Sequence, residues 1–139
     1  TMTKQLDFLE RLKDQIDSLG LYASCRIGRL GAEDSLSLMA MPGGDETVYF
    51  DGARDKAYHI QVNAKSSDPQ KGYEALSVIF QTLENLGDLP SQNSSYEFGG
   101  ITVSSLPSFL HQDEQGYFIH VLSIIANITI YQGVNIQYA

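Results

Sequence analysis

The sequence is short of cysteine, tryptophan and long hydrophobic runs. It contains one cysteine and no tryptophan among its 139 residues. A single cysteine excludes an intramolecular disulfide, and the alternating pattern around Cys25 predicts a buried structural thiol. No apolar run approaches the roughly 18 residues that a membrane-spanning helix needs. We therefore expect a soluble chain, made in the cytoplasm, with no membrane partner.

Positive charge is also scarce. The chain has 9 Lys and Arg residues against 17 Asp and Glu residues, which gives a formal net charge of -8. The basic residues do not form a cluster anywhere along the sequence. Affinity for nucleic acid depends on clustered Lys and Arg that neutralise phosphates. The composition therefore excludes a protein that holds DNA or RNA through a broad basic face.

The sequence shows no established catalytic or metal-binding motif. The histidines, His59, His111 and His120, lack the close paired spacings of compact zinc motifs. His111 is near Asp113 and Glu114, but adjacent residues on a hairpin offer neither a shielded pocket nor a nucleophile. We therefore expect no catalytic residues, no metal and no cofactor. An acid-dependent hydrolase is a weaker alternative, which requires a deep pocket that joins His59 or His120 to carboxylates.

Two amphipathic helices are expected, at about residues 4–18 and 69–86. Thr3 is the expected cap of the first helix, and Asp68 followed by Pro69 marks the start of the second. Apolar residues recur in both segments at spacings of three and four, which is typical of a helix with one buried face. These residues are Leu6, Leu9, Leu12, Ile16 and Leu19 in the first segment, and Tyr73, Leu76, Phe80 and Leu83 in the second.

The helices alternate with groups of strands in a single domain, residues 1–139. A hydrophobic content of 42% and a charged content of 19% are ordinary for a folded domain. Asp51-Gly52 is the sharpest hairpin signal. The order of helix, strands, helix, strands predicts an α+β fold, with a largely antiparallel β-sheet and two amphipathic helices packed on one face. The first five expected strands lie at about 21–28, 36–41, 47–50, 57–66 and 98–106.

The last expected strand is unusually long. Residues 117–131 alternate between apolar and other side chains and contain neither Pro nor Gly. At about 3.3 Å per residue this strand would span roughly 50 Å, whereas a compact chain of this length has a radius of gyration of roughly 14 Å. The strand must therefore bend sharply or project. A projecting strand exposes unpaired backbone groups, which points to assembly with a partner chain.

The hairpin that precedes residue 117 carries most of the candidate partner-contact residues. Its tip is expected to hold aromatic, aliphatic and acidic side chains that suit a contact with another protein, with packing onto the domain itself as an equal alternative. The loops at 42–47, 90–97 and 107–116 are candidates to become ordered on docking. The candidate contact residues are Tyr96, Phe98, Phe109, Leu110, His111, Asp113 and Glu114.

Several stretches of the chain together resemble a known family. They are the N-terminal helix, Gln61-Val-Asn-Ala-Lys65 leading through Asp68 into Gly72-Tyr-Glu-Ala-Leu76, Tyr96-Glu-Phe98, and the run from Gly116-Tyr-Phe-Ile119 through Tyr131. Across most of its length the chain is similar to phage minor capsid proteins related to tail terminators, which act at the head-tail junction of long-tailed phages.

The resemblance implies a structural protein of the virion, assembled in the cytoplasm of the bacterial host. Such a protein forms a ring, commonly a hexamer, that caps the finished tail tube and joins it to the head. Its expected partners are further copies of itself, the tail tube protein and the head-completion protein, and DNA passes through without specific binding. The acidic composition suits such a bore, because carboxylates repel phosphates over a Debye length of about 8 Å.

Two further roles remain as alternatives at this stage. Within the phage interpretation, a head-completion or connector protein of the neck is the nearest rival to a tail terminator. Outside it, a dimeric binding module that pairs through a sheet edge would show the same strand features.

Overall fold

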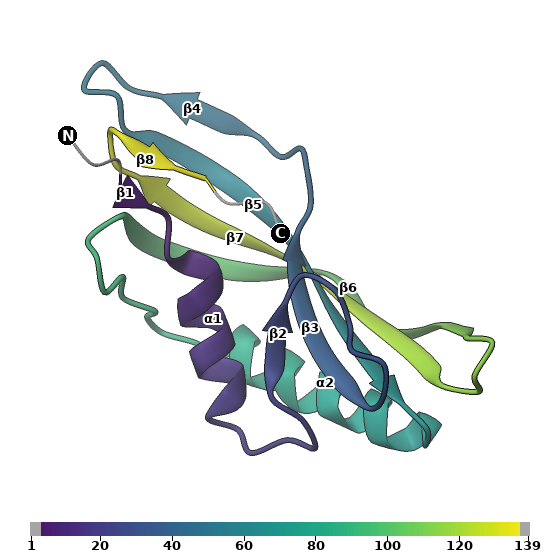
Figure 1. The fold of residues 1–139 in the computed structure, drawn as a ribbon. Helices are drawn as coiled ribbons and strands as arrows, with labels where there is room; N and C mark the ends of the chain where they lie inside the picture. Colours follow the sequence, from purple (N-terminus) through teal and green to yellow (C-terminus); the bar gives the residue numbers. More distant parts are fainter. Residues whose placement is uncertain (1–3, 137–139) are drawn as a thin grey trace.

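The computed structural model describes residues 4–136, which form two helices and eight strands (Figure 1). The helices are α1 (Phe8–Asp17) and α2 (Pro69–Glu84). The strands are β1 (Lys4–Gln5), β2 (Cys25–Ile27), β3 (Ser35–Ala40), β4 (Glu46–Val48), β5 (Arg54–Ser66), β6 (Tyr96–Gln112), β7 (Phe118–Ile130) and β8 (Val134–Asn135). Neither of these helices combines the length and hydropathy that crossing a membrane requires.

One mixed, mostly antiparallel sheet organises the fold. Its strand order is β2-β3-β5-β7-β6, and β4 pairs with β5. Only β2 and β3 run parallel within it, while β1 and β8 form a separate parallel pair. The central strands β5 and β7 pair along their whole lengths, from Arg54 opposite Ile130 to Ser66 opposite Phe118. This register fixes which side chains of both strands share a face.

Both helices cover the same face of the sheet (Figure 1). The sheet side chains beneath them are fully or nearly fully buried, because α1 and α2 bring their own apolar stripes against them. On the central strands these core residues are Tyr58, Ile60, Val62 and Ala64 of β5, and Leu122, Ile124, Ala126, Ile128 and Ile130 of β7. The predicted α+β fold, with two amphipathic helices on a largely antiparallel sheet, is confirmed.

The opposite face of the sheet, here called the bare face, has no helix on it. Its central strands alternate between small polar and apolar side chains, and most of these are partly exposed. On β5 and β7 the bare face consists of Ala57, His59, Gln61, Asn63 and Lys65, and of Val121, Ser123, Ile125, Asn127 and Thr129. The sheet therefore has one dry face and one face that water can reach.

The expected exposure of the long C-terminal strand is wrong. β7 has nearly the predicted length, but β5 lies along one of its edges and β6 along the other. The edge strand is β6, which was expected to end near residue 106 and instead continues to Gln112. Pro107 suggested an end because it cannot donate a ladder hydrogen bond, and an edge strand tolerates that loss. Four register irregularities along β6 absorb the extra residues.

The first helix begins later than expected. Lys4 and Gln5 pair with β8, and the Leu6 N–H donates to the Asn135 carbonyl at 2.9 Å. The chain is therefore not helical before Asp7, which is the N-cap residue of α1. The expected cap, Thr3, lies outside the described residues. The second helix ends at Glu84 rather than near residue 86, because its last turn closes at Asn85.

The Asp7 side chain holds the 90–95 loop against the start of α1. Its carboxylate accepts hydrogen bonds from Ser91 Oγ at 2.7 Å, from Ser95 Oγ at 2.9 Å and from the Gln92 N–H at 2.8 Å. Partial burial opposes ionisation, but these hydrogen bonds outweigh it, so the pKa of Asp7 lies below its usual value. The loop that was expected to be free for docking is thus fastened by a charged acceptor.

The alternation along β7 predicts opposite outcomes for two neighbouring isoleucines. Ile124 is 1% exposed in the core, whereas Ile125 lies on the bare face. Ile124→Asp should abolish cooperative thermal unfolding, because it buries an unpaired charge at a cost of several kcal/mol. Ile125→Asp, the matched control, should still unfold cooperatively. A folded Ile124→Asp protein in circular dichroism would show that this face of β7 is not core.

Removing the Asp7 carboxylate should destabilise the fold. Asp7→Ala leaves three donors without their acceptor, so chemical denaturation at pH 7 should show a loss of about 1–3 kcal/mol. The control Asp14→Ala removes an exposed carboxylate from the same helix and should cost under about 1 kcal/mol. Since the folded-state pKa of Asp7 is lowered, its stabilisation is complete above about pH 4 and is lost below it. Equal losses for the two variants at pH 7 would contradict this role.

Candidate functional site

The β6–β7 hairpin projects at one end of the sheet and is called the arm, residues 106–119 (Figure 1). Its turn is short, because the Asp113 N–H donates to the Tyr117 carbonyl at 2.8 Å. The Asp113 carboxylate accepts the N–H groups of Gln115 and Tyr117, and it lies 3.4 Å from Lys65 Nζ. The arm is thus a hairpin, as expected, and it is tied to Lys65 near the end of β5, while β6 takes up much of the expected loop at 107–116.

The structure divides the candidate contact residues into a core group and an exposed group. Tyr96 is 4% exposed, its hydroxyl donates to the Leu89 carbonyl, and its ring packs edge-on against Phe8 at 5.2 Å. Phe98 stacks on the same Phe8 ring. These two side chains hold α1 on the sheet and do not face outward together. The exposed group lies on the arm and comprises Phe109, Leu110, His111 and Glu114, with Asp113 half-buried by its contact to Lys65.

Phe109 and Leu110 belong to strand β6 and therefore point to opposite faces of the arm. Phe109 is 56% exposed and contacts Phe118 and His120 on the helix side. Leu110 is 54% exposed and faces a groove on the bare face. Neither packs fully onto its own domain, which leaves an apolar group available on each side of the arm.

The groove lies between the arm and the loop at 28–31. It encloses about 410 Å³ over the bare-face side of β3 and β5. Its apolar lining consists of Leu30, Met39, Leu110 and Ile119. Lys65 closes one side, where its ammonium group bonds to the Gly31 carbonyl at 3.1 Å and lies over the Tyr117 ring. The groove is therefore an apolar trough with a fixed wall.

A second exposed apolar group lies on the β4–β5 hairpin and was not anticipated from the sequence. It consists of Val48, Tyr49 and Phe50, called the tip, with exposures of 63%, 48% and 113%. The three residues were expected only as part of a strand at 47–50. A Val-Tyr-Phe run directly before Asp51-Gly52 could have indicated it, because residues at a hairpin turn have few neighbours to cover them.

The segment at 41–45, which begins the expected docking loop at 42–47, is a wide bulge in the edge of the sheet. β3 and β4 pair with successive parts of β5, and residues 41–45 lie opposite residues 57–59. Gly44 has a φ of +92°, and a Cβ atom there would lie 2.1 Å from the Ala57 carbonyl oxygen. Only glycine fits this close approach. The bulge therefore carries the chain along β5 to the tip with a defined backbone path.

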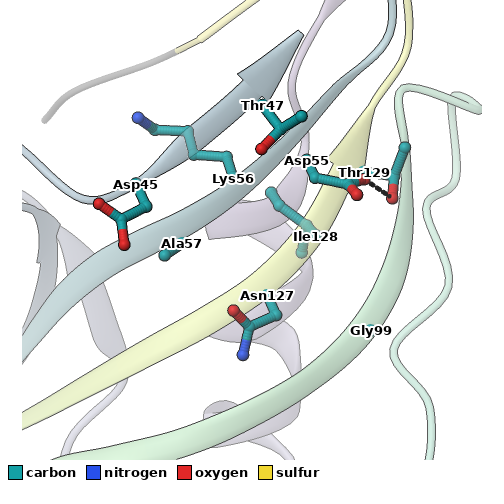
Figure 2. A pocket seen from close by; sticks show the side chains of 9 residues that line it. All are labelled: Asp45, Thr47, Asp55, Lys56, Ala57, Gly99, Asn127, Ile128 and Thr129. Atoms are coloured by element: carbon teal, nitrogen blue, oxygen red, sulfur yellow. Dashed lines mark hydrogen bonds between the residues drawn. The ribbon is translucent and has the colours of Figure 1, made fainter. Parts of the chain in front are cut away.

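A polar depression lies below the tip, beside β5 and β7 (Figure 2). It encloses about 390 Å³, and Figure 2 shows Asp55 joined to Thr129 within it. Asp55 accepts hydrogen bonds from Tyr49 and from Thr129, and these bonds lower its pKa. A carboxylate held ionised by two neutral donors anchors the tip rather than supplying a proton. Among residues 4–136 no group of three or more His, Cys, Asp or Glu side chains could hold a metal ion.

His59 and His120 lie on opposite faces of the sheet. His120 is 5% exposed and packs beside the rings of Tyr73 and Phe109, and burial lowers its pKa. Its Nδ1 atom has no hydrogen-bond partner within the described part of the chain. His120 therefore fills an apolar contact between α2 and the arm. Its ring contacts are thus aromatic, whereas the hydrolase alternative requires carboxylates beside the histidine.

Comparison with known proteins matches the chain to one family. A search of curated proteins gave no match. The family model described as bacteriophage tail terminator protein matches residues 8–130, from the first residue of α1 to the last residue of β7. The matched family is structural and acts in the phage tail, which favours this role over the head-completion and dimeric-module alternatives. The chain belongs to the bacteriophage tail terminator protein family.

Proposed function

We propose that this protein forms an oligomeric ring that stops growth of the phage tail tube and joins the finished tail to the head. The observation that carries the proposal is the family match, which extends over both helices and every strand of the main sheet. Its partners would be further copies of itself, the tail tube protein and a head-completion protein. The protein would act as a component of the virion, assembled in the host cytoplasm.

The distribution of exposed apolar side chains supports assembly. Isolated exposed apolar residues are common, but groups of them mark interaction surfaces. In this chain the two groups lie on projecting hairpins, one at the tip and one on the arm. Within the described residues the group on the tip comprises Val48, Tyr49 and Phe50, and the group on the arm comprises Leu106, Phe109 and Leu110.

The charge of the chain supports passage of DNA through such a ring. A net charge of -8 per subunit would multiply around a closed assembly. Carboxylates that face a bore repel phosphate at short range, so they discourage DNA from adhering as it passes. The role requires no covalent bond to be made or broken. The protein would serve as a rigid spacer whose contacts lie on its projecting hairpins.

Deleting the gene from its phage should change tail length. Without a terminator the tube is expected to grow past its normal end, so electron microscopy should show overlong tails of variable length and heads without tails. Supplying the protein from a plasmid should restore uniform tails and infectivity. Tails of normal, uniform length after deletion would overturn the proposal.

A further inference from the structure

We propose that the tip of one copy of this chain binds in the groove of a second copy, so that subunits join head to tail. The inference rests on the proposed function, because it assigns the two surfaces through which a ring would form. The tip lies just before Arg54, the first residue of β5, and the groove lies over the last part of the same strand. Each subunit thus carries the tip at one end of β5 and the groove at the other end.

The tip is an apolar knob held in a fixed shape. The Tyr49 N–H donates to the Ala53 carbonyl and the Gly52 N–H donates to the Tyr49 carbonyl, both at 2.9 Å. The Tyr49 hydroxyl is anchored on Asp55. Nothing within the described chain covers Phe50. A turn whose backbone is already fixed loses little conformational entropy on binding, and an aromatic side chain has only two rotatable bonds to immobilise, which favours the tip as an anchor.

The groove offers the matching apolar surface. Leu110 is more than half exposed along it, and the neighbouring Lys65 and Asp113 already pair with each other. An aromatic ring placed against Leu30, Met39 and Leu110 would remove their apolar surface from water. The groove and the tip are therefore complementary in chemical character.

The groove cannot receive the tip of its own chain. β5 is one continuous strand, and Asn63 in the groove is nine residues beyond Arg54, which follows the tip. Nine residues of strand span about 30 Å. The occupant must therefore come from another molecule.

Charge favours a second copy as that molecule. Asp51 is exposed next to Phe50, and Glu46 is neutralised by Arg54 within the same hairpin. At the groove, Lys65 is paired with Asp113, while Arg29 is exposed on the rim and makes no ion pair with any residue from 4 to 136. Docking the tip would bring a carboxylate toward an unpaired guanidinium group, which favours this register of the two copies.

Pairing between the free edges of β6 is a poorer route to assembly. Four register irregularities and Pro107 interrupt the ladder of β6, and such features block continuous pairing with another strand. A contact through side chains at the two ends of β5 avoids this obstacle. It is also heterologous, so repeated contacts produce a ring when the rotation between subunits closes.

Each single contact should be weak. The two aromatic rings of the tip offer about 300–500 Å², compared with about 800 Å² per partner in a stable interface. Association in solution should therefore depend strongly on concentration. A closed ring gains from holding every subunit at both ends.

Disulfide cross-linking tests the contact directly. The double variant Phe50→Cys/Leu110→Cys should give a ladder of dimers, trimers and larger species under mild oxidation at high concentration, read on a non-reducing gel in multiples of 15.4 kDa. A mixture of the two single variants should stop at the dimer. The native thiol does not interfere, because Cys25 is buried and burial raises its pKa to about 12.

A matched pair provides the control. Val78 is an exposed apolar residue on α2, away from both surfaces, so Val78→Cys/Leu110→Cys should give at most a trace of cross-linked product. In light scattering, Phe50→Asp should lower the apparent association constant at least tenfold, whereas Val78→Asp should leave it unchanged. The inference would be overturned by the absence of the ladder, by an equal ladder from the control pair, or by unchanged association of Phe50→Asp. A Phe50→Cys protein that cross-links only to the tail tube protein would also overturn it.

The same variants separate this inference from the proposed function. A phage carrying Phe50→Asp should have overlong tails like those of the deletion. Normal tails with Phe50→Asp but overlong tails after deletion would leave the function standing and remove the tip from the interface. A cross-linked ladder together with normal tails after deletion would support the contact and reject the function.

Discussion

The fold depends on the pairing of β5 with β7. This antiparallel ladder runs the full length of both strands, and its register sorts their side chains onto a core face and a bare face. The helices then have one continuous apolar surface on which to pack, from Tyr58 at one end to Ala64 at the other. The two projecting hairpins follow from the same ladder, since the turns that lead into β5 and β7 form the tip and the end of the arm.

Sequence periodicity was sufficient to predict the fold class. Apolar residues at spacings of three and four identified both helices, and the uninterrupted alternation before Tyr131 gave nearly the right length for β7. These signals are local, so they survive without knowledge of the tertiary structure. The Asp51-Gly52 turn was also identified, because its geometry requires a positive φ at Gly52.

The remaining features depend on which strands become neighbours. Pro107 suggested the end of a strand, and its position on the sheet edge is what permits β6 to continue. The exposure of Phe50 likewise follows from a turn at the end of an edge strand, which the Val-Tyr-Phe run indicates only together with the Asp51-Gly52 pair that follows it. Tyr96 and Phe98 were expected to contact a partner, and the position of Phe8 above them explains why Tyr96 is buried and Phe98 partly buried. Long-range pairing decides each of these cases.

The polar side chains on the bare face have a consequence for free subunits. Gln61, Ser123 and Asn127 interrupt the apolar surface that would otherwise drive free subunits to precipitate. A face that water can wet needs no cover, so this side of the sheet offers separate folded chains no continuous apolar surface through which to aggregate.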